Sequence, residues 1–282
     1  MAKNKLNSRI FKDRIFVSIL LLIGCICALP LVLILFFIVK QGINSISLQF
    51  LTHLPKPVGE KGGGVLNAIV GSLMLISMAA VISIPIGILG GIYLSEKKGT
   101  KIANLARSSA EILQGIPSIV IGIIAYLWIV KPMGHFSALS GGIALGFMML
   151  PVILRTTEET LNLIPNSIKE ASLALGVPYY KTILRIILPC GISGIMSGII
   201  ISLARVAGET APLLFTAFGN PYLNTNINRP VQSLPLIIFN YATSPYDDWK
   251  QQAWGASFVL LSFILIISVV AKFVTRRWRV QF

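Results

Sequence analysis

The chain contains six long stretches without a single charged side chain, and this feature limits most strongly what it can fold into. Each stretch holds about 20 residues or more, the length that a helix needs to cross the hydrocarbon core of a bilayer. Backbone groups in lipid must form their hydrogen bonds internally, so we predict helices even where glycine and proline occur. The stretches are 16–39, 62–95, 112–130, 132–154, 186–204 and 251–271.

The composition agrees with a membrane protein. Only 12% of the 282 residues are charged, against roughly 25% in soluble domains. A soluble fold of this size would lack the polar residues needed to cover its surface. The sequence therefore predicts an all-α polytopic membrane protein with about six transmembrane helices. We place them at approximately 16–39, 66–94, 112–130, 137–154, 188–212 and 253–273.

Basic residues are distributed unevenly between the two ends of the predicted spans. Of the 24 lysines and arginines, 17 precede span one or follow spans two, four and six, and six lie at the opposite ends. This asymmetry follows the positive-inside rule and predicts that both termini, including the basic segment 1–15, are cytoplasmic. The net charge of +14 therefore indicates orientation in a membrane, with no nucleic acid as a partner. The stretch 16–39 is too long for the apolar region of a signal peptide, so we predict an uncleaved anchor.

No pattern for catalysis or metal binding is found. Cys25, Cys27 and Cys190 fall inside apolar spans, and His53 and His135 stand alone near span ends, so no metal cluster can be assembled around them. The chain has no nucleophile elbow or paired carboxylates. It also lacks the G-x-x-x-x-G-K-[ST] loop that holds ATP phosphates. We expect no catalytic residue, no metal and no cofactor in this chain.

The predicted cytoplasmic loop 155–187 carries the most specific pattern. We expect a short helix over 168–175 that ends at Gly176, because glycine can adopt a left-handed conformation there. A second helix should start at Pro178, since proline suits the first turn. This helix–glycine–helix unit would suit docking in a cleft of a partner. The full pattern is Glu170-Ala171-Ser172, three residues, Gly176, nine residues, Ile186, one residue, and Leu188-Pro189.

A charged pair, Arg205 and Glu209, occurs near the end of the fifth predicted span. A charge at membrane depth costs at least ~2.5–3.5 kcal/mol, so such residues usually face protein or water. Residues four apart can meet on one helix face, and arginine suits phosphate because its planar fork donates two hydrogen bonds. Either an anion pathway or a structural ion pair that fixes helix register explains the pair. At helical spacing it shares a narrow stripe with Gly191, Gly194, Gly198 and Ser202.

A helix break is expected at Pro117, within Gln114-Gly-Ile-Pro-Ser118. Irregular backbone at membrane depth is tolerated where it is buried in protein or lines a cavity. Ser118 is therefore a candidate for the pathway, although a kink without function explains the pattern as well. The region 213–252 is rich in asparagine, proline and tyrosine, and we expect a structured outer region there.

The 170–189 pattern resembles the E-A-A-x3-G-x9-I-x-L-P coupling motif of ABC importer permeases, with one departure at Ser172. The stretch Gly208-Glu-Thr-Ala-Pro-Leu213 resembles the signature of PstA-type permease subunits of bacterial phosphate importers. The resemblance covers roughly residues 16–275 and implies a type I ABC importer (MetI-like) core over 65–275. Further matching stretches are Ala68-Ile-Val-Gly-Ser72, Ile84-Pro-Ile-Gly87, Ile92-Tyr-Leu-Ser-Glu96, Gly115-Ile-Pro-Ser-Ile-Val120 and Gln252-Ala-Trp-Gly-Ala256.

The resemblance implies a permease in the bacterial inner membrane that imports inorganic phosphate. Its implied partners are a PstC-type permease, a PstB-type ATPase dimer that binds ATP and Mg²⁺, and a PstS-type phosphate-binding protein. A permease for molybdate or sulfate, or a secondary transporter driven by an ion gradient, remains an alternative. The implied coupling residues are Glu170, Ala171, Ser172, Gly176 and Pro189. From the residues themselves, the candidate pathway residues are Arg205, Glu209, Thr210, Ser202 and Ser118.

Overall fold

The computed structural model describes residues 2–60 and 62–276, and all the regular secondary structure in these ranges is helical. The last six residues, which include the predicted basic positions Arg277 and Arg279, lie outside the described residues. In chain order the elements are α1 (Ala2–Gly42), the 3-10 turn η1 (Ile43–Ser45), α2 (Leu48–Thr52), α3 (Leu66–Glu96), α4 (Lys101–Gly115), α5 (Ser118–Ala125), the π-helical turn η2 (Tyr126–Val130), α6 (Lys131–Met133), α7 (Ala138–Asn162), α8 (Asn166–Ala174), α9 (Tyr179–Thr182), the π-helical turn η3 (Ile183–Ile187), α10 (Leu188–Ala207), α11 (Ala211–Leu214), α12 (Leu234–Ala242) and α13 (Asp247–Arg276).

Five helical stretches of the described chain are long and apolar enough to cross a membrane, and a sixth span results if α4 and α5 are counted together. The prediction of an all-α protein with about six such helices is confirmed. The five single stretches are Lys12–Ser45, Leu66–Glu96, Ala138–Asn162, Tyr179–Ala207 and Asp247–Val270.

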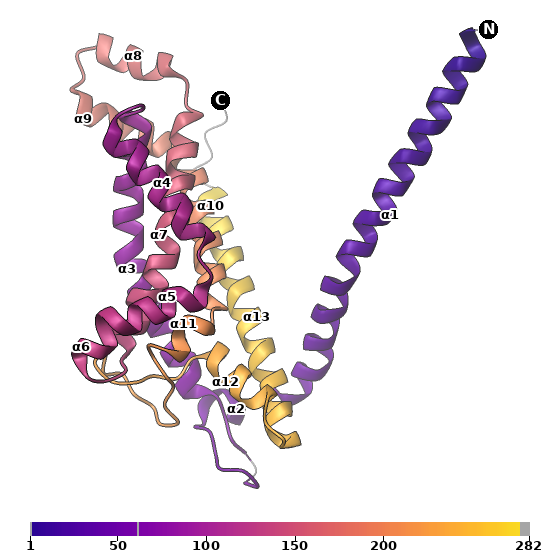
Figure 1. The fold of residues 1–282 in the computed structure, drawn as a ribbon, viewed down its shortest axis with the longest axis vertical. Helices are drawn as coiled ribbons and strands as arrows, with labels where there is room; N and C mark the ends of the chain where they lie inside the picture. The colour runs from indigo at the N-terminus through magenta and orange to yellow at the C-terminus, as the bar shows by residue number, and fades with distance from the viewer. Residues whose placement is uncertain (1, 61, 277–282) are drawn as a thin grey trace.

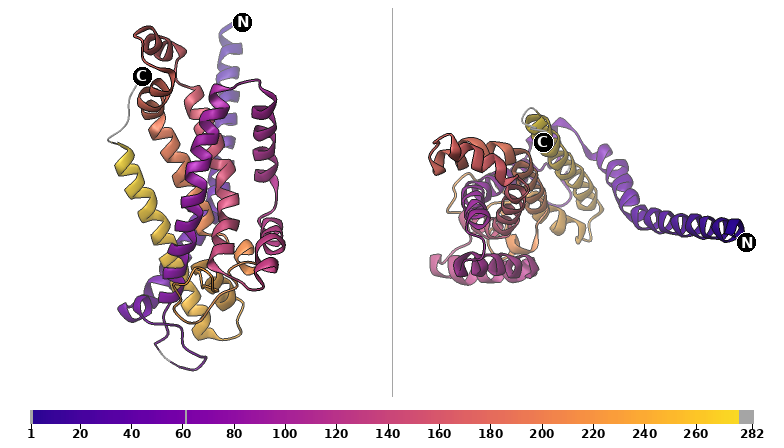
Figure 2. Two further views of the ribbon diagram at one scale, coloured as in Figure 1. Left: turned by 90° about the vertical axis from the view of Figure 1, so that its left-hand side faces the viewer. Right: turned by 90° about the horizontal axis from the view of Figure 1, so that it is seen from above.

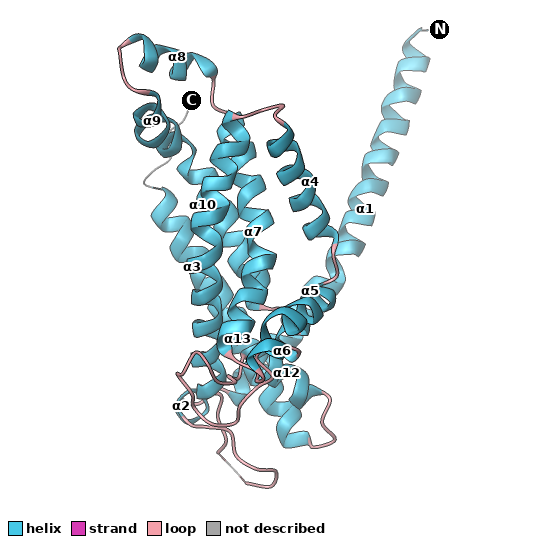
Figure 3. Ribbon diagram, turned by 60° about the vertical axis from the view of Figure 1, so that its left-hand side comes forward, coloured by secondary structure: helices cyan, strands magenta, loops and turns pink. Residues whose placement is uncertain are grey.

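The range 112–130, expected as one span, is divided by a sharp bend. The helical segments before and after the break differ in direction by 107°, and Figure 3 shows α5 turning away from the line of α4. Ile116 and Pro117 both have extended backbone at the bend. Proline has no backbone N–H and disfavours helical backbone in the residue before it, which explains why the helix ends here.

Helix α7 lies at the centre of the bundle, between α3, α4 and α10 (Figure 1). Two glycines of α3 allow its backbone to approach α7 closely. A Cβ atom on Gly87 would lie 2.7 Å from Cγ2 of Ile153, and one on Gly91 would lie 2.5 Å from Cβ of Thr157. Small residues at such contacts are typical of helix packing in membranes.

Glycines also allow α10 to approach α7 closely, on another side of that helix. A Cβ atom on Gly194 would lie 2.5 Å from Cγ2 of Thr160, and one on Gly198 would overlap with the Thr156 side chain. Most of the glycine stripe predicted on the fifth span is therefore a packing surface against α7. Ile195 of α10 is fully buried in the same core as Ile153 of α7.

The expected loop 155–187 is mostly helical. Helix α7 continues two turns beyond 154 to Asn162, and α9, η3 and α10 form one uninterrupted helix from Tyr179 to Ala207. The π-helical turn η3 ends two residues before Pro189, and η2 ends two residues before Pro132. A proline removes a helical hydrogen bond and crowds the carbonyl four residues earlier, and the wider π turn accommodates both effects.

The other end of the bundle is closed by α2, α12 and the chain between α11 and α12 (Figure 1). The Asn67 amide of α3 donates hydrogen bonds to the carbonyls of Asn220 and Pro221, and Ser72 Oγ accepts one of 2.8 Å from the Leu234 backbone N–H. These contacts hold the region 213–252 against α3, so it is structured.

Helix α1 leaves the bundle as a long arm, as Figure 1 and the right-hand view of Figure 2 show. Its apolar side chains between 15 and 39 are exposed except for the half-buried Ile38, which suits a lipid environment. Contact with α13 is made near its end, where a Cβ atom on Gly42 would lie 2.5 Å from Cβ of Phe258.

Replacing Gly198 with valine should loosen the contact between α10 and α7, because overpacking of a tight contact costs about 1–3 kcal/mol. We expect Gly198→Val to lower the thermal unfolding midpoint of the purified full chain in detergent. The matched control is Gly24→Val in α1, since a Cβ atom there meets nothing within 4 Å. Equal midpoints for the two variants would contradict this account of the interface.

Candidate functional site

The sequence-predicted residues lie at the two ends of one long helix. The segment Tyr179–Ala207 contains 29 residues and therefore extends roughly 43 Å. Its first turns belong to the coupling motif, and Arg205 lies in its last turn. A displacement at one end can thus reach the other through a continuous helix.

Arg205 and Glu209 form a loose pair. Helix α10 ends at Ala207, so Glu209 lies in the turn after Gly208 and not on the helix that was expected to reach 212. Arg205 Nε lies 3.9 Å from Glu209 Oε1, and the two side chains are 49% and 19% exposed, respectively. Ion pairs this exposed contribute little to stability, so the Arg205 guanidinium keeps donors available for another anion.

Two interrupted helices meet beside this pair. A Cβ atom on Gly122 of α5 would lie 2.7 Å from Cα of Pro212 in α11. Ser118 lies one turn before Gly122 on the same face of α5 and is half-buried. Discontinuous helices commonly form binding sites in transporters, because their ends present free backbone groups. The structure thus brings α5 against the start of α11 at Gly122.

The remaining predicted pathway residues have different surroundings. Ser202 is buried, and its hydroxyl donates a 2.8 Å hydrogen bond to the Ile199 carbonyl within α10. Thr210 is half-buried, and its carbonyl accepts the Leu213 backbone N–H at 3.1 Å. The predicted stripe therefore has two parts. Its residues up to Ser202 pack within the protein, and its accessible polar side chains are Arg205 and Glu209.

The coupling motif folds into a compact unit of residues 166–182, which we call the knob. Helix α8 ends at Ala174, and Gly176 has a φ of +75°. The Gly176 N–H donates to the Leu173 carbonyl at 2.9 Å, and the Val177 N–H donates to the Ser172 carbonyl at 3.3 Å. This paired arrangement is the Schellman motif, in which a left-handed glycine ends a helix. The local structure is the one the sequence predicts.

Ser172, the one departure from the coupling motif, has a partner inside the knob. Its hydroxyl lies 2.9 Å from the Thr182 hydroxyl of α9, and both side chains are buried. The serine therefore joins the two helices of the knob where alanine would only fill space.

The outer surface of the knob is apolar and exposed. Leu175 is 84% exposed, and Tyr180 is also exposed. Glu170 and Ala171 are exposed as well, as is Pro189 at the start of α10. An exposed apolar surface with a polar rim is typical of a protein-binding site.

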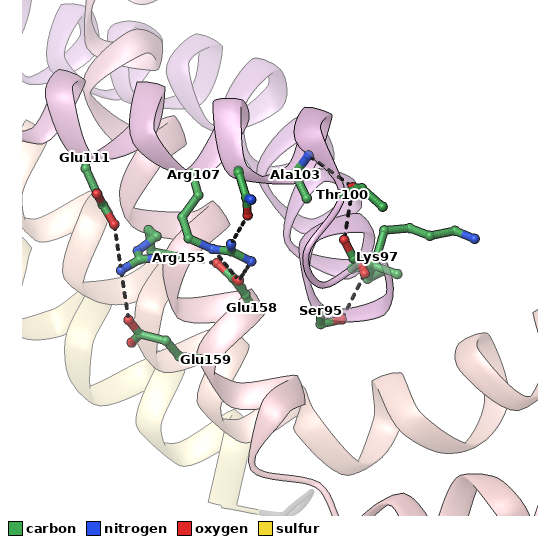
Figure 4. Close-up of polar contacts among 11 residues, drawn as sticks. Ser95, Lys97, Thr100, Ala103, Arg107, Glu111, Arg155, Glu158 and Glu159 are labelled. Atoms are coloured by element: carbon green, nitrogen blue, oxygen red, sulfur yellow. Dashed lines mark hydrogen bonds and ion pairs between the residues drawn. The ribbon is translucent and has the colours of Figure 1, made fainter.

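Sequence reasoning missed a cluster of ion pairs between α4 and α7, drawn in Figure 4. The buried Glu158 carboxylate accepts hydrogen bonds of 2.9 and 2.6 Å from Arg107 and one of 3.5 Å from Arg155. Arg155 also lies 3.2 Å from Glu111. Paired arginines satisfy a buried carboxylate, and the cluster fixes α4 against α7. Only the helical spacing of Arg155 from Glu158 and Glu159 was visible in the sequence.

A second missed contact joins the knob to α3. Both Lys169 and Tyr179 donate hydrogen bonds to the Glu96 carboxylate at the end of α3. Among the described residues, no group of three or more His, Cys, Asp or Glu side chains is arranged to hold a metal ion.

Comparisons with known proteins agree with this architecture. Residues 83–280 match the family described as "Binding-protein-dependent transport system inner membrane component". The chain is 42% identical to the "Phosphate transport system permease protein PstA" of Yersinia pestis, covering 86% of this chain and 82% of that protein. It is 37% identical to the PstA protein of Pasteurella multocida, covering 96% of this chain and 97% of that protein.

Two solved structures share the fold. An inward-facing MetNI methionine ABC transporter has a TM-score of 0.60 at 20% identity, covering 77% of this chain and 95% of that one. A bacterial alginate ABC transporter has a TM-score of 0.64 at 15% identity, covering 94% and 96%. The chain is therefore a multi-pass membrane protein, and it belongs to the family of binding-protein-dependent transport system inner membrane components, within the PstA group of permease proteins.

Proposed function

We propose that this chain is the transmembrane permease subunit of an ATP-driven importer of inorganic phosphate. The observation that carries the proposal is the continuous Tyr179–Ala207 helix, which joins the knob to Arg205. The relatives named as phosphate transport permeases support phosphate as the substrate. They do not favour molybdate, sulfate or an ion-driven secondary transporter.

The knob is proposed to face the cytoplasm, together with both termini. Lys98, Lys101 and Lys169 lie at the same end of the bundle as α8 and α9, and cytoplasmic ends carry excess lysine and arginine. The membrane would be the bacterial inner membrane. The end that contains α2 and α12 then faces outward, and Arg205 lies toward that side.

Arg205 is proposed to bind the entering phosphate. Its exposed guanidinium can form the bidentate hydrogen bonds that phosphate accepts, and Glu209 would hold it in position while the site is empty. Ser118 is the first residue of α5 and Thr210 directly precedes α11, and both hydroxyls are proposed to line the same path. Ser202 would contribute to the shape of α10, since its hydroxyl is bonded within the helix.

Docking on a separate ATPase is proposed to use Glu170, Ala171 and Gly176 of the knob together with Pro189 at the start of α10, while the buried Ser172 holds the two helices of the knob together. ATP and Mg²⁺ would be bound by that partner, a PstB-type dimer, so this chain is a transport subunit and not an enzyme. A PstC-type permease would supply the other half of the path, and a PstS-type protein would deliver phosphate. ATP binding would close the ATPase dimer and move the knob, and the long helix would transmit this movement to the outer site. Hydrolysis would then reset the bundle.

Removal of the Arg205 charge should abolish phosphate uptake while leaving assembly intact. We expect Arg205→Gln to reduce ATP-dependent uptake of labelled phosphate at least ~tenfold, since hydrogen bonds to a charged group contribute about 1.5–3 kcal/mol. Uptake is measured in cells that lack other phosphate importers and express the partner subunits. Arg229→Gln, an exposed arginine in the 213–252 region, is the matched control. Normal uptake by Arg205→Gln would make the pair purely structural.

Insertion of a large side chain at Gly176 should separate the knob from the ATPase. The φ of +75° at this position costs roughly 1–2 kcal/mol for a residue other than glycine. We expect Gly176→Arg to lose both phosphate uptake and co-purification of the ATPase. If Gly176→Arg retains the ATPase and transports normally, the knob is not the docking element. If the wild type moves no phosphate with its partners present, the substrate assignment fails.

The Ser172–Thr182 hydrogen bond leads us to expect different losses of stability when either partner is replaced. Thr182→Val leaves the buried Ser172 hydroxyl without this partner, which should cost about 1–3 kcal/mol. Ser172→Ala should cost less, because Thr182 still donates to the Pro178 carbonyl at 3.4 Å. We therefore expect Ser172→Ala to rescue Thr182→Val in thermal unfolding of the full chain. Additive losses in the double variant would show that the two hydroxyls act independently.

A further inference from the structure

The Glu96 carboxylate binds both helices of the knob, although it belongs to neither. Lys169 Nζ and Tyr179 OH each donate a hydrogen bond to Glu96 Oε2. The two donors also contact each other, because Lys169 Nζ lies 3.2 Å from Tyr179 OH and 4.8 Å from the centroid of its ring. We call these three residues the Glu96 clamp.

The two hydrogen-bond donors of the clamp lie on different helices of the knob. Lys169 lies in α8, directly before Glu170 of the coupling motif, and Tyr179 is the first residue of α9. The left-handed turn at Gly176 lies between them. One carboxylate from α3 therefore ties down both sides of the knob, and the knob cannot tilt without moving the end of α3 or breaking the clamp.

The backbone of α8 packs mainly on α9 and η3. Its Ile168 side chain adds an apolar contact with the main core. A polar cavity of about 260 Å³ lies beside the clamp, and it is lined by α3, by the end of α7 and by the start of α8. No apolar side chains fill this cavity. The hydrogen bonds of the clamp connect α3 to α8 and α9 at its edge.

The clamp is also partly shielded from water. The side chains of Glu96 and Lys169 are 15% and 25% exposed, respectively, so their pairing is screened less than that of a surface ion pair. Burial lowers the pKa of Lys169, but the hydrogen bonds to Glu96 and Tyr179 outweigh it and raise the pKa above its ordinary value. The contribution of Lys169 to stability is therefore present throughout the neutral range and is lost only as the pH rises through the raised pKa.

We infer that Glu96 is a positioning residue for energy coupling. It holds the knob on α3, so that a displacement of the knob moves α3 together with α10. Helix α3 is packed on α7 through Gly87 and Gly91, and α10 is packed on α7 through Gly194 and Gly198. A displacement of the knob therefore reaches α7 both through α3 and through α10. This inference rests on the proposed docking of the knob to an ATPase.

The test uses charge reversal. Glu96→Lys and Lys169→Glu each place like charges opposite one another, and the double variant restores an opposite pair in reversed order. Lys98→Gln is the matched control, because it removes a lysine charge from the same cavity outside the clamp. A first readout is hydrogen exchange of the backbone amides 166–182 in the full chain in lipid nanodiscs, without partners. The second is phosphate transported per ATP hydrolysed in the complete complex.

We expect each single reversal to raise amide exchange in 166–182 about tenfold, the change expected from losing a hydrogen bond to a charged group. Transport per ATP should fall by a similar factor while the ATPase still co-purifies. The double variant should return both readouts to within about twofold of the wild type. Lys98→Gln should change neither.

Three outcomes overturn the inference or separate it from the proposed function. If Glu96→Lys shows the same amide exchange in 166–182 and the same phosphate transport per ATP as the wild type, the clamp does not hold the knob. Failure of the double variant to recover would show that the Glu96–Lys169 pairing is not what matters. If the wild-type complex transports no phosphate, the proposed function fails, and the exchange readout alone then decides whether the clamp exists.

Discussion

The close contacts on two sides of α7 are the constraint on which the rest of the structure depends. In lipid, the hydrophobic effect does not drive helices together, so close packing and polar contacts must do so. Gly87 and Gly91 bring α3 against α7, and Gly194 and Gly198 bring α10 against it. These approaches fix the two helices that carry the clamp and the long connection to Arg205. Larger residues at these positions would push α3 and α10 away from α7.

The polar clusters at the knob end extend this frame to less well packed elements. Glu158 holds the amphipathic α4 through Arg107, and Glu96 holds the knob through Lys169 and Tyr179. Both carboxylates lie near helix ends, where charges are tolerated more easily than at membrane depth. Ion pairs can open and close without disturbing the apolar core, which suits elements that must move during a transport cycle.

Toward the end of the bundle opposite the knob, two of the long helices are interrupted. Helix α4 breaks at Pro117, and α10 breaks at Gly208. Arg205 lies in the last turn before the second break, and the contact of Gly122 with Pro212 joins the helices that follow the two breaks. The interruptions leave polar backbone groups and the half-exposed Arg205 side chain at this end, whereas the centre of the bundle is packed through glycines.

The sequence by itself determined the features that depend on local chemistry. Lipid forces each charge-free stretch into a helix, and Gly176 with Pro178 ends one short helix and starts the next. The class, the number of long apolar helices and the shape of the knob followed from these rules. The sequence predicts the break at Pro117, but the tertiary structure alone decided its angle of 107°, the continuation of α9 into α10, and the meeting of Glu96 with Lys169. These features depend on packing between residues far apart in the chain, and spacing along a sequence carries no information about which distant side chains come together.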